Sequence, residues 1–425
     1  MFNINHMKEQ IRNNINNPPV LEELYNEDSK EFSAAFSEIF NEIKDQPAAA
    51  FWKARLDTAV KRKKFKQLQI KDIALLVLSC IIAGLLIHIP LLLGFEPASY
   101  QFYERNAAII FFFGLTLYTL LTGPGISRKQ LTVVVLLFLI PALYINMLPS
   151  KPGSQSVTLA QIHLPLLMWC IYGIVCVNFN ISSIKSRIEF IKHNGDMAIM
   201  GAITLIAGIA ISVMTITMFS VIDINLEALY SDYLVGWGLV SAPVITLFVI
   251  KSFPGISSRI APVMATVFTP VVLLVLIVFL ASIPFSGLNP YSDRDFLLVF
   301  NIMLLAVTAL IVFAATETKG AEPRRFSLRV LFLTATVALI INIVALSAIF
   351  YRLGEFGITP NRIAVLGSNI LVFINLILIA RDLYRALFNN GLISRIEATT
   401  AEYLKYYLFW VLFVVFAFPL IFGME

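Results

Sequence analysis

The residues best suited to chemistry lie in one short polar segment, 351–362, which has the sequence YRLGEFGITPNR. It places Arg352, Glu355 and Arg362 between two long apolar runs, and charges this close to a bilayer are costly unless they are solvated, paired or used. Arg352 and Glu355 are three residues apart and share a face if a helix continues to this point. Two interpretations stay open: a well-capped turn, or an arginine site that binds a carboxylate or phosphate through the planar guanidinium group.

Other charged residues stand at the ends of neighbouring apolar runs and are candidates for the same anion or lipid site. Arg105 and Arg294 are the further basic candidates, and each has an acidic neighbour that offers a local ion pair instead. The candidate partners at this face are Glu104, Asp293, Asp295 and His163. Because one glutamate cannot neutralise two arginines, we expect either that these acids clamp Arg352 and Arg362 or that one guanidinium attracts an anion.

The sequence carries no recognised catalytic or cofactor motif. Segment 123–129, GPGISRK, lacks P-loop spacing, and no HExxH, GxSxG, kinase or EF-hand pattern occurs. Cys80, Cys170 and Cys176 lie in apolar runs without CxxC spacing, which is typical of packing residues rather than of a disulfide or zinc site. We therefore predict no metal and no cofactor, assign no catalytic residue and favour a role other than catalysis.

The apolar runs that must position these residues predict an all-α fold, a polytopic transmembrane helical bundle over residues 71–425. The chain is 58% hydrophobic and 14% charged, whereas soluble domains carry about 25% charged residues. About eleven runs are long enough to cross a bilayer as helices. They cover residues 73–94, 107–122, 131–149, 160–179, 197–220, 234–250, 263–284, 296–315, 330–350, 363–380 and 406–422.

The loops between these runs predict an orientation in the membrane. Lysine and arginine residues favour one set of alternating loops over the other by about three to one, and such basic loops stay in the cytoplasm. A cluster that includes segment 61–64, KRKK, precedes the first run on the same side. We therefore expect a bacterial cytoplasmic (inner) membrane protein with its N-terminus inside and its C-terminus outside, so that the arginine candidates lie at the outer face.

Three expectations concern the inner side. Segment 193–196, HNGD, is expected to be a turn that precedes the fifth span, and segment 383–407 is expected to include a helix on or near the inner surface. No acidic residue is expected in the middle of a span. Buried intramembrane acids are the usual mark of ion-coupled transport, so this pattern argues against a proton- or sodium-driven transporter.

Residues 1–70 are expected to form a cytoplasmic helical segment. Residues 1–17 are polar and are expected to be frayed. Asp28 and Glu31 have capping-box spacing, and the residues that follow place one apolar stripe along a helix: Phe32, Phe36, Ile39, Phe40 and Ile43. The stripe predicts a small helical cap, and a docking platform for a cytoplasmic protein partner is the alternative.

Several strings resemble, in the right order, a bacterial multi-pass inner-membrane family known as domain of unknown function 4153. They are LEELYNEDSKEFSAAFSEIF, FWKARL, FYERN, NMLPS, QIHLP, KHNGD, NPYSDRDFL and EFGITPNRIAVLGSN, and the resemblance covers essentially the whole chain. It implies a fold type and a location. The family has no established activity to carry over, so the resemblance implies no reaction and no catalytic residue.

Three functions remain open. The first is a binding, assembly or scaffold component with a polar or anion site at the outer face. The second is a permease or flippase for an anionic or lipid-linked substrate, and the third is an enzyme acting on lipid-linked substrates with Glu104 or Asp293. A cavity reaching the bilayer midplane would favour the second, and a filled bundle the first. Membrane lipids are the expected partners, an oligomer is compatible with the sequence, and no nucleic acid is expected because the basic residues are not interleaved with exposed aromatics.

Overall fold

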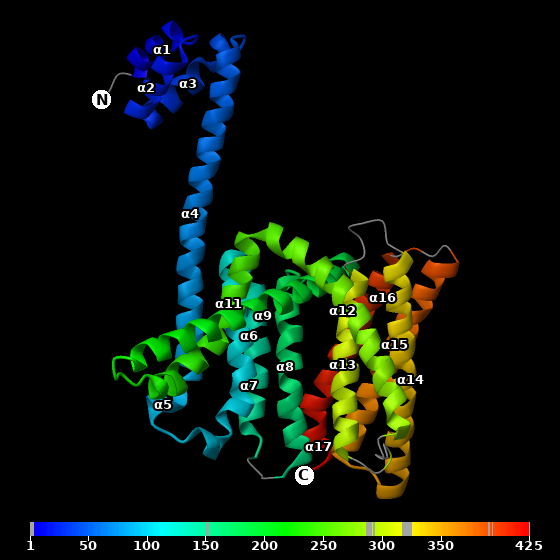
Figure 1. Ribbon diagram of the computed structural model, residues 1–425. Coiled ribbons are helices and arrows are strands. Elements are labelled where there is room, and N and C mark those ends of the chain that lie inside the picture. Colours follow the sequence, from blue (N-terminus) through cyan, green and yellow to red (C-terminus); the bar gives the residue numbers. More distant parts are fainter. Residues whose placement is uncertain are drawn as a thin grey trace. The chain divides into compact units, whose positions relative to one another are not determined.

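The computed structural model describes residues 4–149, 153–285, 291, 294–316, 325–389, 392 and 394–424. Within these ranges, the side chains of residues 29–30, 57–69, 99, 254–259, 261–262, 264, 284, 294–299 and 316 lie outside the description. The regular elements of the described chain are all helices (Figure 1). Contacts divide the chain into two units, Met1–Ala74 and Leu75–Glu425.

The N-terminal unit packs around its own hydrophobic core. It consists of α1 (Ile4–Asn13), α2 (Pro18–Glu27), α3 (Ser29–Ile43) and the first part of α4 (Pro47–Ile87). Phe36 and Ile39 are 2% and 1% exposed, as the apolar stripe predicts, and Phe40 is half-buried beneath Lys53, 4.0 Å from its ring centroid. The stripe is therefore buried within this unit and is not an exposed docking face.

The first residues of the chain differ from the sequence expectation. Most of the segment predicted to be frayed forms α1, in which Met7 and Ile11 are buried. They lie four residues apart, so they share one helix face and pack on the core. Ion pairs from Lys8 to Glu38 and from Arg12 to Glu42 join α1 to α3. The mostly polar helix α1 is thus held on the core by two apolar side chains, and two ion pairs to α3 add to this contact.

The C-terminal unit is a multi-pass bundle, and the predicted all-α transmembrane fold is confirmed. In the described chain, ten helices are long and apolar enough to cross a membrane. They comprise residues 70–87 of α4, α6 (Phe102–Thr122), α7 (Arg128–Met147), α8 (Gln155–Cys176), α9 (Ile184–Ser220), 227–252 with α11 (Val235–Ser252), 265–282 of α12 (Pro254–Ser282), α14 (Arg325–Phe356), α15 (Pro360–Phe388), and 394–421, which begins with α16 (Ser394–Leu412) and ends with α17 (Phe418–Ile421). The predicted span 296–315 coincides with α13 (Arg294–Thr316), whose apolar stretch Phe300–Ala315 is shorter.

Several helices extend beyond the apolar windows that predicted them. α9 begins at Ile184 rather than at residue 197, so segment 193–196 lies inside a helix and the expected turn is wrong. The α15 and α16 helices likewise occupy most of the segment expected to hold a separate surface helix. Hydropathy finds only the apolar part of a helix, whereas backbone hydrogen bonding continues wherever polar side chains find partners on neighbouring helices.

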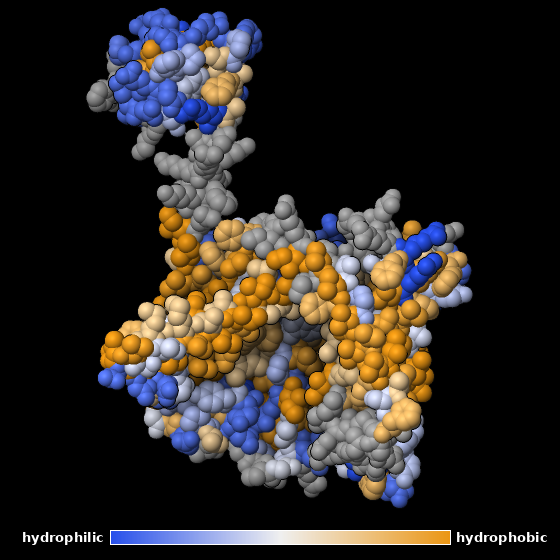
Figure 2. All heavy atoms as spheres, viewed as in Figure 1, coloured by the Kyte–Doolittle hydropathy of each residue, from blue (hydrophilic) through white to orange (hydrophobic). Residues whose placement is uncertain are grey.

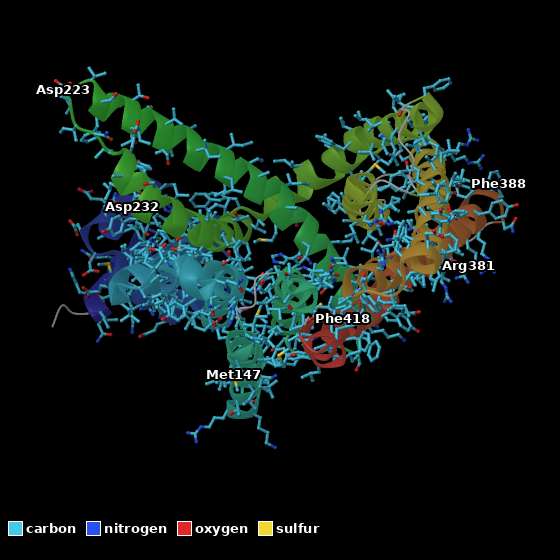
Figure 3. All side chains as sticks on the ribbon, turned by 90° about the horizontal axis from the view of Figure 1, so that it is seen from below. Met147, Asp223, Asp232, Arg381, Phe388 and Phe418 are labelled. Carbon is cyan, nitrogen blue, oxygen red and sulfur yellow. The ribbon has the colours of Figure 1, made fainter. Side chains whose placement is uncertain are left out.

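The helices of this unit gather into two main packed groups. One hydrophobic cluster joins α12, α13, α14 and α15, and another joins α6, α7 and α8 with the π-helical segment 413–417. The α16 helix touches α8, α9, α13 and α15, and so it bridges the two groups. Seen from below, α9 runs lengthwise across the view toward the residue labelled Asp223, whereas α8 is seen nearly end-on (Figure 3).

Candidate functional site

The first predicted arginine, Arg105, ties two helices together at the predicted outer end of the bundle. It is buried near the start of α6, and its Nη1 donates hydrogen bonds to the backbone oxygens of Asn146, at 3.2 Å, and Leu148, at 2.8 Å. These carbonyls belong to the end of α7, where the helix leaves them without intrahelical partners. The neighbouring Glu104 is exposed. Arg105 therefore closes a helix end.

The opening segment 351–362 forms the turn between α14 and α15. Arg362 Nη1 donates to the backbone oxygens of Phe356, at 2.6 Å, and Gly357, at 2.7 Å, and Gly357 adopts the left-handed conformation with φ +76°. Glu355 is exposed, and Arg352 is half-buried. In the described structure the buried Nη1 of Arg352 has no hydrogen-bond partner. The turn interpretation therefore fits Arg362, whereas Arg352 keeps donor capacity.

The described contacts do not join the predicted outer residues into one site. His163 bonds the backbone oxygen of Leu159 on its own helix, at 2.9 Å. No hydrogen bond or ion pair between described residues connects the Arg105 group with the Arg362 turn. Asp293 and the side chains of Arg294 and Asp295 lie outside the described residues. A shared anion site at this face stays a prediction.

A different segment, 192–195 of α9, contacts several helices, and we call it the α9 hub. Lys192 Nζ lies 3.7 Å from Oε1 of Glu397, which is fully buried on α16. Nε2 of His193 and the hydroxyl of Tyr172 on α8 are hydrogen bonded at 2.9 Å. Two successive side chains thus hold α9 to two different helices.

The next two residues of the α9 hub continue this pattern. Asn194 Oδ1 accepts a hydrogen bond from Trp169 Nε1 on α8, at 2.8 Å. Gly195 packs so closely on α13 that an added Cβ would lie 1.9 Å from Cε2 of Phe313. An added Cβ at this crossing would therefore force the Phe313 ring or one of the two helices to shift.

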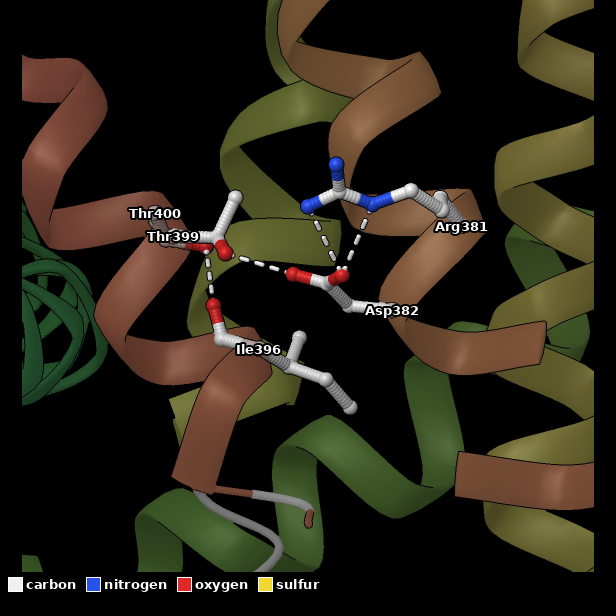
Figure 4. Close-up of polar contacts among 5 residues, drawn as sticks. All are labelled: Arg381, Asp382, Ile396, Thr399 and Thr400. Carbon is white, nitrogen blue, oxygen red and sulfur yellow. Dashed lines mark hydrogen bonds and ion pairs between the residues drawn. The ribbon is translucent and has the colours of Figure 1, made fainter. Parts of the chain in front are cut away.

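Two acidic residues are buried near helix ends, outside the middle of the spans to which the expectation applies. Asp382 is 2% exposed near the end of α15, and Glu397 is 0% exposed near the start of α16. Asp382 Oδ1 accepts from Arg381 at 3.0 Å, and Oδ2 accepts from Thr399 at 2.5 Å (Figure 4). Both acids flank the predicted apolar windows and lie on helices that continue past those windows. Buried charges of this kind need partners.

A cavity of about 830 Å³ lies between the two groups of helices. Its walls come from α8, α9, α12, α13, α15 and α16, and Figure 2 shows a hollow with a largely apolar rim on this face. The polar residues in its lining are Asn194, Thr308, Asn375, Thr400, Tyr407 and Trp169. No charged residue lines it within the described chain. Its volume falls in the range of small-molecule pockets.

A second cavity of about 490 Å³ lies on the other side of α9, against α6, α8 and α11. It is more polar, and Lys251 Nζ bonds Thr122 Oγ1 there, at 2.5 Å. Phe190 and His193 line this cavity, whereas Asn194 lines the large one. The α9 hub is therefore the wall between a polar and an apolar cavity.

The signal that marks this region is the string KHNGD, a run of polar residues directly before an apolar window. Among the described residues, no group of three or more His, Cys, Asp or Glu side chains is placed to hold a metal ion. Comparison of the chain with protein families, with curated proteins and with solved structures finds no match in any of the three. The geometry therefore carries the functional argument alone.

Proposed function

We propose that this multi-pass membrane protein takes a lipid-like amphiphile into its large cavity and acts as a permease or flippase for a lipid-linked substrate. The observation that carries the proposal is an open cavity of about 830 Å³ lined by six helices of the bundle, five of which are long and apolar enough to cross a membrane. A scaffold function does not require a cavity of this size, and an unfilled void forfeits packing contacts. This bundle keeps a void large enough for a ligand.

The lining matches the chemistry of a lipid chain. Its apolar wall includes Ala198, Ala202, Ile206, Phe268, Leu305 and Phe313. Burying apolar ligand surface against such side chains is favourable by roughly 25 cal/mol per Å². The few polar groups lie on α8, α9, α13, α15 and α16 and would orient a head group rather than solvate a charge.

The test is to fill the cavity and to measure the lipid that stays with the protein. Ala198 and Ala202 are exposed toward the cavity on α9, so tryptophan at either position occupies its space. We expect Ala198→Trp and Ala202→Trp to lose most of the lipid that mass spectrometry finds on the purified protein, and to slow transfer of a fluorescent lipid between the leaflets of proteoliposomes. Ile209→Trp, at an exposed position of the same helix, is the matched control and should keep both. Equal lipid content and transfer in all variants would contradict the proposal.

We also propose the finer location that the loops predict: a bacterial inner membrane, an inner N-terminus and an outer C-terminus. The charge bias of the loops supports this orientation. Reporters fused at Lys64 and Arg325 should indicate a cytoplasmic position, and reporters fused at Lys151 and Glu425 should indicate a position outside the cytoplasm. A cytoplasmic signal at Lys151 or Glu425 would overturn the orientation.

A further inference from the structure

One residue in the lining of the large cavity carries a buried polar atom without a partner in the described structure. Asn375, in the middle of α15, lines the cavity and is 0% exposed. Its Nδ2 donates to the hydroxyl oxygen of Tyr407 on α16, at 2.9 Å, whereas its Oδ1 has no hydrogen-bond partner in the described structure. Buried amide oxygens are nearly always satisfied, so an unsatisfied one at a cavity wall points to a donor supplied by a ligand.

Tyr407 supplies the complementary capacity. Its hydroxyl oxygen accepts the hydrogen bond from Asn375, so its own hydrogen is directed elsewhere, and Tyr407 also lines the cavity. Neighbouring side chains on α15 and α16 therefore offer one acceptor and one donor in an otherwise apolar space. A hydroxyl group both donates and accepts, and so it satisfies both residues at once.

We propose that this pair binds the hydroxyl head of an uncharged, long-chain alcohol, the class that includes fatty and prenyl alcohols. The hydroxyl donates to Asn375 Oδ1 and accepts from Tyr407. A carboxylate or ammonium head is disfavoured because the described lining offers no charged side chain to compensate its desolvation. If the amide group of Asn375 is turned over, it presents a donor instead of an acceptor, and a hydroxyl group pairs with that equally well.

The inference rests on the proposed function and narrows it to one class of head group. Its test uses four probes with one chain length: 1-hexadecanol, its methyl ether, hexadecane and palmitate. Each probe competes against radiolabelled 1-hexadecanol on the full-length protein in nanodiscs. The alcohol should bind about tenfold tighter than the ether, which cannot donate, because one hydrogen bond separates them. The alkane and palmitate should bind more weakly still.

The variants assign the preference to the two residues. Asn375→Leu should remove the preference for alcohol over ether, and Tyr407→Phe should weaken alcohol binding more than alkane binding. The matched control is Asn342→Leu, because Asn342 is also fully buried with an unpartnered Oδ1 but is not part of the cavity lining. This variant should keep the preference. If Asn375→Leu does not fold, the test of the hydroxyl site rests on whether Tyr407→Phe weakens alcohol binding more than alkane binding.

The outcomes separate the two proposals. Equal affinity for alcohol, ether and alkane would overturn the hydroxyl site and leave a lipid cavity in place. A preference that survives in Asn375→Leu and Tyr407→Phe would also overturn it, because the hydroxyl would then bind elsewhere. Failure of every probe, hexadecane included, to bind the wild-type protein would contradict the proposed function itself.

Discussion

The two ends of the membrane bundle use charged residues in opposite ways. At the predicted outer end, Arg105 and Arg362 donate to backbone carbonyls where helices end. At the other end, Lys192 and Arg381 meet the buried carboxylates of Glu397 and Asp382. The first arrangement closes turns and helix ends, whereas the second holds helices around a cavity. A charged residue near a bilayer therefore does not by itself mark a ligand site. The identity of its partner shows whether the residue closes a helix end or holds helices together.

The consequence of losing a charge differs accordingly. A carbonyl at a helix end can turn to water or to a neighbouring donor, because it lies at the boundary of the apolar region. A buried carboxylate that loses its cation cannot turn to water instead, because its burial has already removed its hydration. We therefore expect the inner end to be the more sensitive to substitution, and the predictions below test that ranking.

The largest effect is expected for Lys192→Met, which keeps the length of the side chain and removes the cation beside Glu397. Glu397 is fully buried and Lys192 is about one-third exposed, so the cost should be about 3 kcal/mol, at the lower end for a broken buried pair. The thermal midpoint of the detergent-purified protein reports it. Adding Glu397→Gln should recover part of the loss. Lys185→Met, at an exposed lysine of the same helix, is the control and should change little.

A somewhat smaller effect is expected for Gly195→Ala. The new methyl group would lie 1.9 Å from the ring of Phe313, so the ring or the helix must move, and overpacking of this kind costs about 1–3 kcal/mol. Gly208→Ala is the matched control in the same helix, because nothing lies within 4 Å of its added Cβ. It should be neutral or slightly stabilising, since alanine favours helix over glycine. Equal midpoints for the two variants would show that α9 and α13 do not cross as closely as the structure describes.

The fold was largely predictable because its determinants are local. The apolar runs give the spans directly, and Thr359 followed by Pro360 marks the start of α15, where the Thr359 side chain accepts from the Arg362 backbone at 3.4 Å. The stripe that includes Phe36 and Ile39 likewise predicts the burial that is found. In each case the pattern of residue types within one segment is enough to predict the element or its buried face.

The site was harder to predict because its contacts join residues far apart in the chain. Lys192 and Glu397 are separated by most of the membrane unit, and neither lies in an apolar window. The long polar start of α9 hides that His193 and Asn194 face two cavities. Sequence reasoning favoured segment 351–362 because its charges are concentrated, although the bonds of Arg362 stay within that segment.

The smallest effects separate the two outer arginines. Lysine keeps the charge at each position, but its shorter side chain does not place a nitrogen where the arginine Nη1 makes both hydrogen bonds. Arg105 is 4% exposed and reaches the end of another helix, so Arg105→Lys should cost about 1.5 kcal/mol, near the value for hydrogen bonds to a charged group. Arg362 is less buried and bonds its own turn, so Arg362→Lys should cost less than about 1 kcal/mol. Thermal midpoints measured side by side give both values.

The same pair of variants, with Arg352→Lys added, tests whether the outer end has any role beyond closure. If Arg362 only closes the turn and Arg352 binds no ligand, Arg352→Lys and Arg362→Lys should retain as much anionic lipid as the wild type after purification. Selective loss of anionic lipid in Arg352→Lys would instead assign a lipid phosphate to the donor that lacks a partner in the described structure. That result would reverse the comparison between the two ends, because the predicted outer face would then bind a ligand through its charge while the apolar cavity binds one without it.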